Sequence, residues 1–262
     1  MIDFKKFPLA AKRDRVDARD RMKAVGPVAV PERSVVGYLP PIMNQGQESS
    51  CTGHAVAYFW ESLLATTLGK SIALSPRFLW WAGRAIEGAQ LEDVGVEMRD
   101  AIAALKQYGA CPAEHYPASG PVDAEPSQLA FAYGTALCLP AYERCADLNA
   151  IKYAIGVERF PVVIGLQITE DWYTTYAVKT GLIGFYPSSA PIGGHALCIV
   201  GYDDTTKRLR LANSWGTTYG FGGFVEVDYT YLTDGQPWDA WTAAPGCLAQ
   251  PGNAEGLPAV AG

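Results

Sequence analysis

The chain of 262 residues lacks the features that mark membrane and secreted proteins. It has no continuous apolar run long enough to predict a transmembrane helix, so we expect no membrane partner. Residues 1–9 include Asp3, Lys5 and Lys6 and no apolar core. We therefore expect no secretory signal peptide there, and a location either in the cytoplasm or outside the cell by a route that needs none.

Cysteine is also scarce, because six residues in a chain of this length fall well short of a disulfide scaffold. Cys51 and Cys198 lie in motifs treated below, which leaves Cys111, Cys138, Cys145 and Cys247. Four cysteines allow three pairings, and the sequence does not select one. We expect mostly free thiols in a reducing compartment.

Positive charge is limited, since the chain carries a net charge of −6. This balance argues against a nucleic-acid partner. The charge is unevenly spread: residues 1–34 contain nine Lys or Arg and five Asp or Glu, a net charge of +4, so the remainder carries −10. The sequence therefore predicts a basic N-terminal arm, residues 1–39, and an acidic body. The arm is expected either to be solvated or to pack on the body and cover its cleft, as a short propeptide would.

The first chemically informative stretch is the polar loop around Gln45 that leads into Cys51. From Cys51 onward, apolar residues recur at steps of three and four up to Gly69, which predicts a helix preceded by a Ser cap. A thiol on the first turn of a helix faces unsatisfied N–H groups and the positive end of the helix dipole, and both favour the thiolate. Cys51 is thus a candidate nucleophile.

Two later motifs supply partners for that thiol. His195 opens an apolar, strand-like run 144 residues after Cys51, and Asn213 begins Asn-Ser-Trp-Gly 162 residues after it. A Cys near the N-terminus with His and Asn at about these spacings is typical of papain-type active sites. The motifs around Gln45, Cys51, His195 and Asn213 agree in order and spacing, and over about residues 40–227 the chain resembles the papain-like cysteine peptidases.

The resemblance implies an α+β fold of two lobes, a mainly helical N-terminal lobe and an antiparallel, barrel-like β lobe, with the active site in the cleft between them. It implies a Cys51–His195–Asn213 triad, with Gln45 in the oxyanion hole. Trp215 would cover the His–Asn pair. It requires no cofactor.

Two glycines are candidate substrate-binding positions. Gly95 is placed where an extended peptide would bond to backbone, and Gly194 stands where the family often has a polar residue before the histidine. Thr52, after the nucleophile, also departs from the usual aromatic residue. These departures concern substrate preference more than reaction type.

The remaining elements follow from local patterns. The segment 10–25 has helix-forming residues, and further helices are predicted after Ser75, from Gly95 to Gly109, and over 146–156. Strands are predicted over 129–133, 162–167, 183–186, 196–201, 208–212 and 223–228. The resulting divisions are the arm (1–39), a helical lobe (40–126), a β lobe (127–236) and a C-terminal tail (237–262).

The predicted function is a cysteine endopeptidase acting on a peptide or protein through an acyl-enzyme, as a monomer. Three alternatives remain open. The same acyl-enzyme serves a transamidase, the fold could hold a peptide without cleaving it, and Cys51, His54 and His195 could be metal ligands instead.

Overall fold

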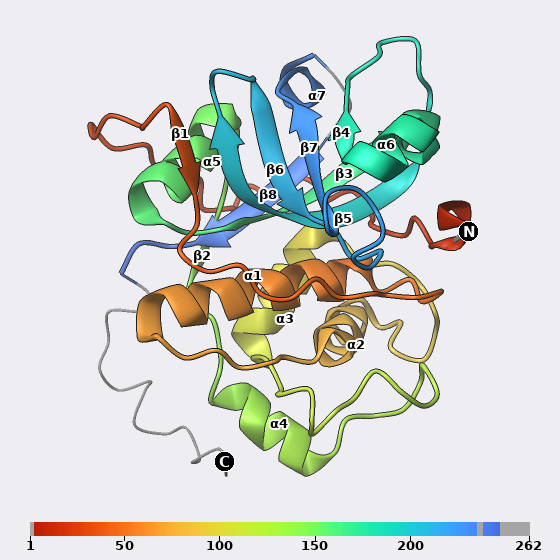
Figure 1. The fold of residues 1–262 in the computed structure, drawn as a ribbon. Coiled ribbons are helices and arrows are strands. Elements are labelled where there is room, and N and C mark those ends of the chain that lie inside the picture. The colour runs from red at the N-terminus through yellow and green to blue at the C-terminus, as the bar shows by residue number, and fades with distance from the viewer. Residues whose placement is uncertain (1–2, 235–237, 247–262) are drawn as a thin grey trace.

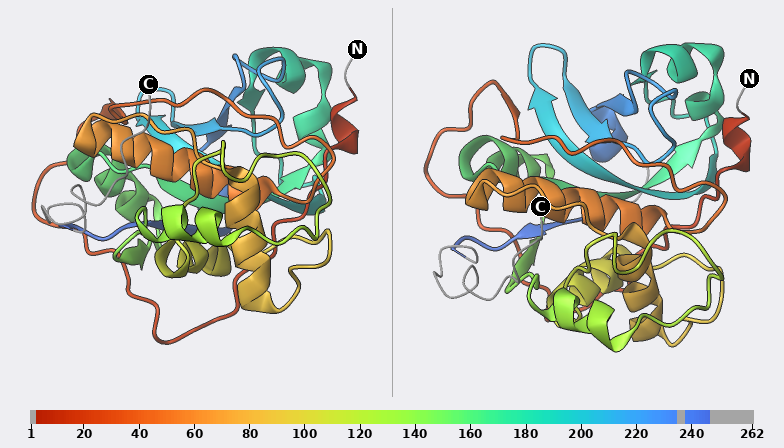
Figure 2. Two further views of the ribbon diagram at one scale, coloured as in Figure 1. Left: turned by 90° about the horizontal axis from the view of Figure 1, so that it is seen from below. Right: turned by 60° about the horizontal axis from the view of Figure 1, so that its bottom comes forward.

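The structure, a computed structural model, describes residues 3–234 and 238–246. Its helices α1 to α4 lie on one side of a large sheet, below it in Figure 1, and they again lie below most of the sheet in the right-hand view of Figure 2. The N-terminus lies beside the junction of the two parts. That junction is where residues distant in sequence meet.

Helix α1, Cys51–Leu68, is the central element of the helical part. Its first fourteen residues are all buried, because it packs on α2 and α3 and on strands of the sheet. The helix ends as predicted at Gly69, which has a φ of 65° and donates its N–H to the Ala65 carbonyl. Ser50 occupies the N-cap position but makes no side-chain capping bond.

Helices α2, Pro76–Glu87, and α3, Met98–Gln107, confirm two further predictions. At the start of α2 the Ser75 hydroxyl accepts the Phe78 N–H at 3.0 Å. Gly53 on α1 lets the two helices approach, since a Cβ there would lie 2.2 Å from the Pro76 carbonyl oxygen.

The strand predicted over 129–133 is wrong, because this segment forms helix α4, Gln128–Thr135. The Ser127 hydroxyl caps it by accepting the Ala130 N–H at 3.1 Å. A short apolar run fits helix and strand periodicity equally well, and here the cap and the packing of Phe131 on Phe78 and Trp81 favour the helix. The helical part therefore extends past residue 126.

The sheet has the order β2-β8-β3-β5-β6-β7-β4, with β1 also paired to β5. All pairs are antiparallel except β4 with β7. The strands are β1 Arg33–Val35, β2 Tyr142–Arg144, β3 Val162–Thr169, β4 Leu182–Ile183, β5 Pro191–Asp203, β6 Arg208–Ala212, β7 Phe224–Asp228 and β8 Trp238–Ala243. Five differ from expectation. The sequence predicts no strand at β1 or β2, β4 has only two residues, β5 begins five residues before the predicted start, and β8 carries the sheet into the predicted tail.

Short helices complete the described chain. They are η1 Phe4–Lys6, α5 Leu148–Tyr153, the π-helix η2 Ala154–Glu158, η3 Glu170–Tyr173, α6 Thr175–Thr180 and α7 Thr230–Thr233. No helix in the described ranges is long and apolar enough to cross a membrane. The five described cysteines are free thiols, and Cys247 lies outside the described residues.

The N-terminal arm is extended where helix-forming residues 10–25 suggested a helix. Its backbone bonds to the body instead: Ala11 N–H donates to the Gly194 carbonyl at 3.0 Å and Lys12 N–H to the Val96 carbonyl at 3.1 Å. Further along, Lys23 N–H donates to the Arg144 carbonyl at 2.8 Å. These tertiary hydrogen bonds outweigh local helix propensity.

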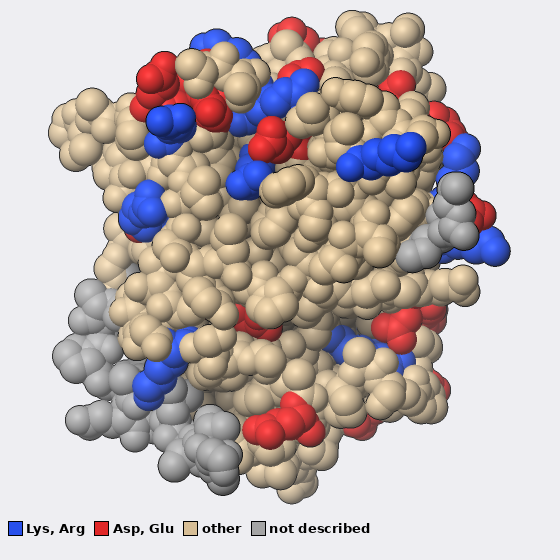
Figure 3. All heavy atoms as spheres, viewed as in Figure 1, with Lys and Arg blue, Asp and Glu red and all other residues tan. Residues whose placement is uncertain are grey.

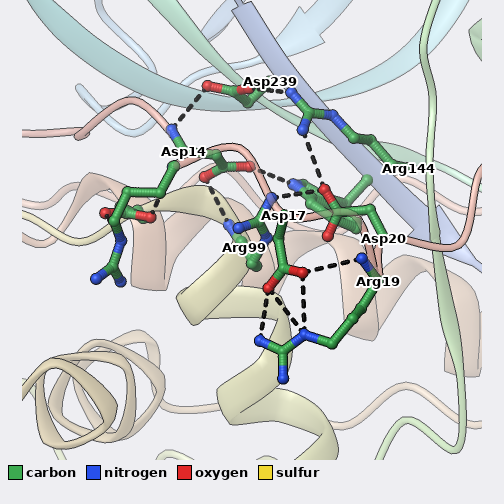
Figure 4. A network of polar contacts seen from close by, with 10 residues as sticks. Asp14, Asp17, Arg19, Asp20, Arg99, Arg144 and Asp239 are labelled. Carbon is green, nitrogen blue, oxygen red and sulfur yellow. Dashed lines mark hydrogen bonds and ion pairs between the residues drawn. The ribbon is translucent and has the colours of Figure 1, made fainter.

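Ion pairs fix the same arm to the body (Figure 4). Asp20 contacts Arg99 at 2.5 Å and Arg144 at 3.1 Å, and Arg144 also contacts Asp239 at 2.5 Å. The side chain of Lys23 is fully buried. On the face drawn in Figure 3, acidic and basic groups alternate along the upper rim around a largely uncharged middle.

Candidate functional site

Cys51 opens α1 at the junction with the sheet, and its side chain is fully buried. Burial raises the pKa of the Cys51 thiol above its ordinary value. Nearby backbone groups of Ala196, Ala10, Thr52 and Ala11 oppose this shift. Ala10 and Ala11 belong to the N-terminal arm, so the backbone of the arm lies close to the thiol.

His195 lies on β5, next to Ala196, and meets Asn213 at the end of the β5–β6 hairpin. Its Nε2 is 2.8 Å from the Asn213 Oδ1, and the ring stacks on Trp215 with a centroid distance of 4.7 Å. Because Oδ1 can only accept, the proton of a neutral ring belongs on Nε2 and leaves Nδ1 as a base. Within the described chain Nδ1 has no hydrogen-bond partner.

Burial favours the neutral forms of Cys51 and His195. It lowers the pKa of His195 to about 4, although the hydrogen bond that the ring donates to Asn213 raises it. A raised thiol pKa and a lowered imidazole pKa together disfavour the thiolate–imidazolium pair. Access of water to Cys51 and His195 should reverse both shifts.

Gln45 is positioned by Ser214, the residue that follows Asn213. Its side-chain Oε1 accepts the Ser214 hydroxyl at 2.6 Å, and its backbone N–H donates to the Ser214 carbonyl at 2.8 Å. The amide nitrogen donates to the Glu48 carbonyl at 3.0 Å and approaches the Pro8 carbonyl of the arm at 3.4 Å. The Gln45 amide nitrogen is therefore held as a donor to backbone carbonyls of its own loop and of the arm.

The two candidate substrate-binding glycines both contact the arm. A Cβ on Gly95 would lie 1.4 Å from the Ala10 carbonyl oxygen, and one on Gly194 would lie 2.0 Å from that of Ala11. Only glycine allows so close an approach of two backbones. Trp215, the third candidate, is fully buried and stacks on His195, and its ring centroid lies 5.9 Å from that of Phe7 in the arm.

A metal-binding alternative finds no ligand set here. Nowhere in residues 3–234 and 238–246 do three or more His, Cys, Asp or Glu side chains group as metal ligands. The Nδ1 of His54 instead lies 3.0 Å from the Ser50 carbonyl oxygen.

Sequence reasoning missed Ser214 and the arm residues Ala10 and Ala11. Ser214 had a signal, because it stands inside the Asn-Ser-Trp-Gly motif. Ala10 and Ala11 contribute only backbone, which no residue pattern reveals.

Comparison with known proteins agrees with this geometry. The sequence model of the papain family of cysteine proteases matches residues 26–233. An uncharacterized peptidase C1-like protein of Acanthamoeba polyphaga mimivirus is 28% identical over 204 residues, covering 73% of this chain and 65% of that protein. A senescence-specific cysteine protease of Oryza sativa subsp. indica is 26% identical over 200 residues, covering 73% of this chain and 55% of that protein. The chain thus spans less than two thirds of the length of either relative.

Solved structures give the same fold. Xylellain, a cysteine protease from Xylella fastidiosa, superposes with a TM-score of 0.84 at 25% identity and covers 91% of this chain and 96% of its own. Digestive procathepsin L 3 of Tenebrio molitor larval midgut has a TM-score of 0.69 at 19% identity, covering 90% and 76%. The α+β fold predicted from the sequence is confirmed, and with the family match over most of its length the chain belongs to the papain family of cysteine proteases.

Proposed function

We propose that this chain is a cysteine endopeptidase that hydrolyses peptide bonds through Cys51, His195 and Asn213. The observation that carries the proposal is the 2.8 Å contact of His195 Nε2 with Asn213 Oδ1, next to Ala196, whose backbone lies close to the Cys51 thiol. This contact leaves Nδ1 of His195 unprotonated and free to act as a base.

The positions of the protons on Cys51 and His195 define the reaction steps. His195 Nδ1 takes the Cys51 proton, and the thiolate attacks the peptide carbonyl carbon to form a C–S bond. The negative oxygen is stabilised by the Gln45 amide and the Cys51 backbone N–H. Collapse breaks the C–N bond, and His195 returns the proton to the leaving amine. Water, deprotonated by the same ring, then hydrolyses the thioester.

Replacing Gln45 with alanine should lower kcat by about 10²- to 10³-fold and leave KM nearly unchanged, because one oxyanion donor is lost. Steady-state hydrolysis of a fluorogenic peptide measures both constants. The matched control is Gln47→Ala, since Gln47 lies exposed on the same loop. Equal kcat values in the two variants would show that the Gln45 amide does not stabilise the transition state.

A transamidase remains the second candidate because it shares the acyl-enzyme. Peptide turnover measured with and without an added primary amine separates the two, with products identified by mass. A free carboxylate as the main product supports hydrolysis, and an amide adduct at millimolar amine supports transfer. Labelling of Cys51 without any turnover would support a silent peptide-binding module.

We propose further that the N-terminal arm inhibits this activity. Its residues 8–12 lie over Cys51, bond to Gly194 and Val96, and approach Gln45. The Ala11 N–H donates to the carbonyl of Gly194, the residue before His195, at 3.0 Å. The arm is therefore held where it blocks access to Cys51 and His195.

Acid should strengthen docking of the arm through Asp14. Burial raises the pKa of Asp14 from 3.8 to about 6, and the negative charge of Asp239 contributes to the rise. Hydrogen bonds that the carboxylate accepts from the Arg99 N–H and Trp241 Nε1 oppose this shift. In a released arm the carboxyl is exposed and regains its ordinary pKa. The docked state therefore binds the proton more tightly, and docking strengthens as the pH falls through about 6 toward 3.8.

Hydrogen exchange measures this dependence. Protection factors of the Ala11 and Lys12 amides should be about tenfold larger near pH 5 than near pH 7, since one pKa unit corresponds to a tenfold change. Asp14→Asn should remove most of the difference. Protection that instead increases with pH would contradict the assignment to Asp14.

A further inference from the structure

His54, one turn after Cys51 on α1, is a buried histidine that the proposed chemistry does not use. Its Nδ1 lies 3.0 Å from the Ser50 carbonyl oxygen, which can only accept. The ring proton therefore belongs on Nδ1, and Nε2 is left as an acceptor. Burial lowers the pKa of His54 to about 4, so the ring stays neutral near pH 7 and keeps this acceptor.

The ring lines a small cavity behind the proposed active site. Tyr58, Asn213 and Ser214 supply its other polar walls, and Met43 and Ala196 are among the apolar ones. The cavity volume is about 10 Å³, which is close to the space of a single water molecule. A water bound in a protein needs two to four polar partners.

Two buried polar atoms of the lining residues have no partner in the described chain: Asn213 Nδ2 and the Tyr58 hydroxyl. Asn213 Nδ2 is a donor, the hydroxyl can donate or accept, and His54 Nε2 accepts. A single water satisfies this set, because it can accept from Asn213 and donate to His54 while it bonds to Tyr58. Buried polar groups left unpaired are rare, so the match of donors and acceptors points to an occupied site.

The orientation of the Asn213 amide has consequences for His195. With Oδ1 toward Nε2, the proton sits on Nε2 and Nδ1 is free to take the thiol proton. If the amide turned over, Nδ2 would donate to Nε2, the proton would move to Nδ1, and the base would be lost. The Ser214 N–H also donates to Oδ1, at 2.7 Å, so it supports the same orientation from the other side.

We propose that His54 is a positioning residue that, together with Tyr58, binds one water accepting a hydrogen bond from Asn213 Nδ2, and that this water holds the amide with its oxygen toward His195. The inference rests on the proposed Cys51–His195–Asn213 chemistry. It assigns a task to an imidazole that would otherwise be an unexplained polar group in the core.

Nitrogen-15 labelling of histidine tests this in the full chain, because the protein has only three histidines. Long-range proton–nitrogen spectra distinguish a protonated from a bare ring nitrogen, and His115→Gln and His195→Gln assign the signals. In the wild type we expect His195 to be protonated at Nε2 and bare at Nδ1. In His54→Leu, which removes the acceptor, the Nδ1 signal should move toward the protonated position.

His54→Gln is the rescue variant, because its side-chain oxygen can accept from the same water, and it should keep the wild-type pattern. Tyr58→Phe keeps the ring and removes the second partner of the water, so it should shift the His195 Nδ1 signal in the same direction as His54→Leu. If thermal unfolding shows that His54→Leu does not fold, Tyr58→Phe takes its place in the test. An unchanged His195 tautomer in the folded variant would overturn the proposal, as would a wild type already protonated at Nδ1.

Activity gives an independent readout. His54→Leu should lower kcat with KM unchanged, because the water supports the base and not the substrate. A protein whose arm is released by Asp20→Ala/Lys23→Ala, and which shows the expected tautomer but cleaves no peptide, would refute the peptidase assignment and leave the positioning role of His54 intact. The two failures are therefore distinguishable.

Discussion

Replacing His195 with alanine should reduce kcat for peptide hydrolysis by about 10⁴- to 10⁶-fold, as loss of a triad base does in other hydrolases. The physical reason is that no other base faces the sulfur: His54 is turned to the Ser50 carbonyl, and the thiol pKa is raised by burial. Single-turnover and steady-state assays with a fluorogenic peptide measure the loss.

The matched control for this substitution is His115→Ala. His115 stacks on Tyr133 at a centroid distance of 4.0 Å in the loop that precedes α4, so its loss removes the same side chain without touching Cys51. We expect wild-type kcat from this control. If His195→Ala retained more than a hundredth of wild-type kcat while folding normally, general-base catalysis by His195 would be excluded.

The second large effect concerns the arm. Asp20 pairs with Arg99 and Arg144, and the buried Lys23 ammonium contacts Glu143 at 3.0 Å and Glu158 at 2.6 Å. Removing one partner of a buried ion pair costs about 3–5 kcal/mol, because the other charge stays buried and uncompensated. The double variant Asp20→Ala/Lys23→Ala should therefore release the arm and raise the rate at which a thiol-directed inhibitor labels Cys51 by at least about 100-fold.

A control with the same change in charge lies a few residues away in the arm. Asp17 and Arg19 pair with each other, and the Arg19 side chain is 90% exposed. Exposed pairs contribute about 0–1 kcal/mol, so Asp17→Ala/Arg19→Ala should label at nearly the wild-type rate. Equal rates for the two double variants would mean that the arm does not control access to the thiol.

Local chemistry made much of the helical part and the site predictable. The end of α1 at Gly69 and the start of α2 at Ser75 could be predicted, because a left-handed residue after a helix favours glycine and an N-cap favours serine. The His195–Asn213 contact followed from two motifs joined by a single hairpin. In each case the determining residues lie close together in the sequence.

The features that escaped prediction depend on distant partners. Residues 129–133 form a helix because Phe131 packs on Phe78 and Trp81, and β8 forms because β2 and β3 present open edges to it. The arm is extended because its N–H groups find carbonyls on β5 and before α3. Neither propensity nor periodicity encodes such contacts.

Cys51 should be the one activated nucleophile among the cysteines. Reaction of the full chain and of Asp20→Ala/Lys23→Ala with an epoxysuccinyl inhibitor, followed by intact mass and peptide mapping, tests this. We expect one adduct, on Cys51, which forms faster in the variant and is absent after Cys51→Ala, with Cys111, Cys138, Cys145 and Cys198 unmodified. An adduct that persists in Cys51→Ala, or none on Cys51 in either protein, would contradict it.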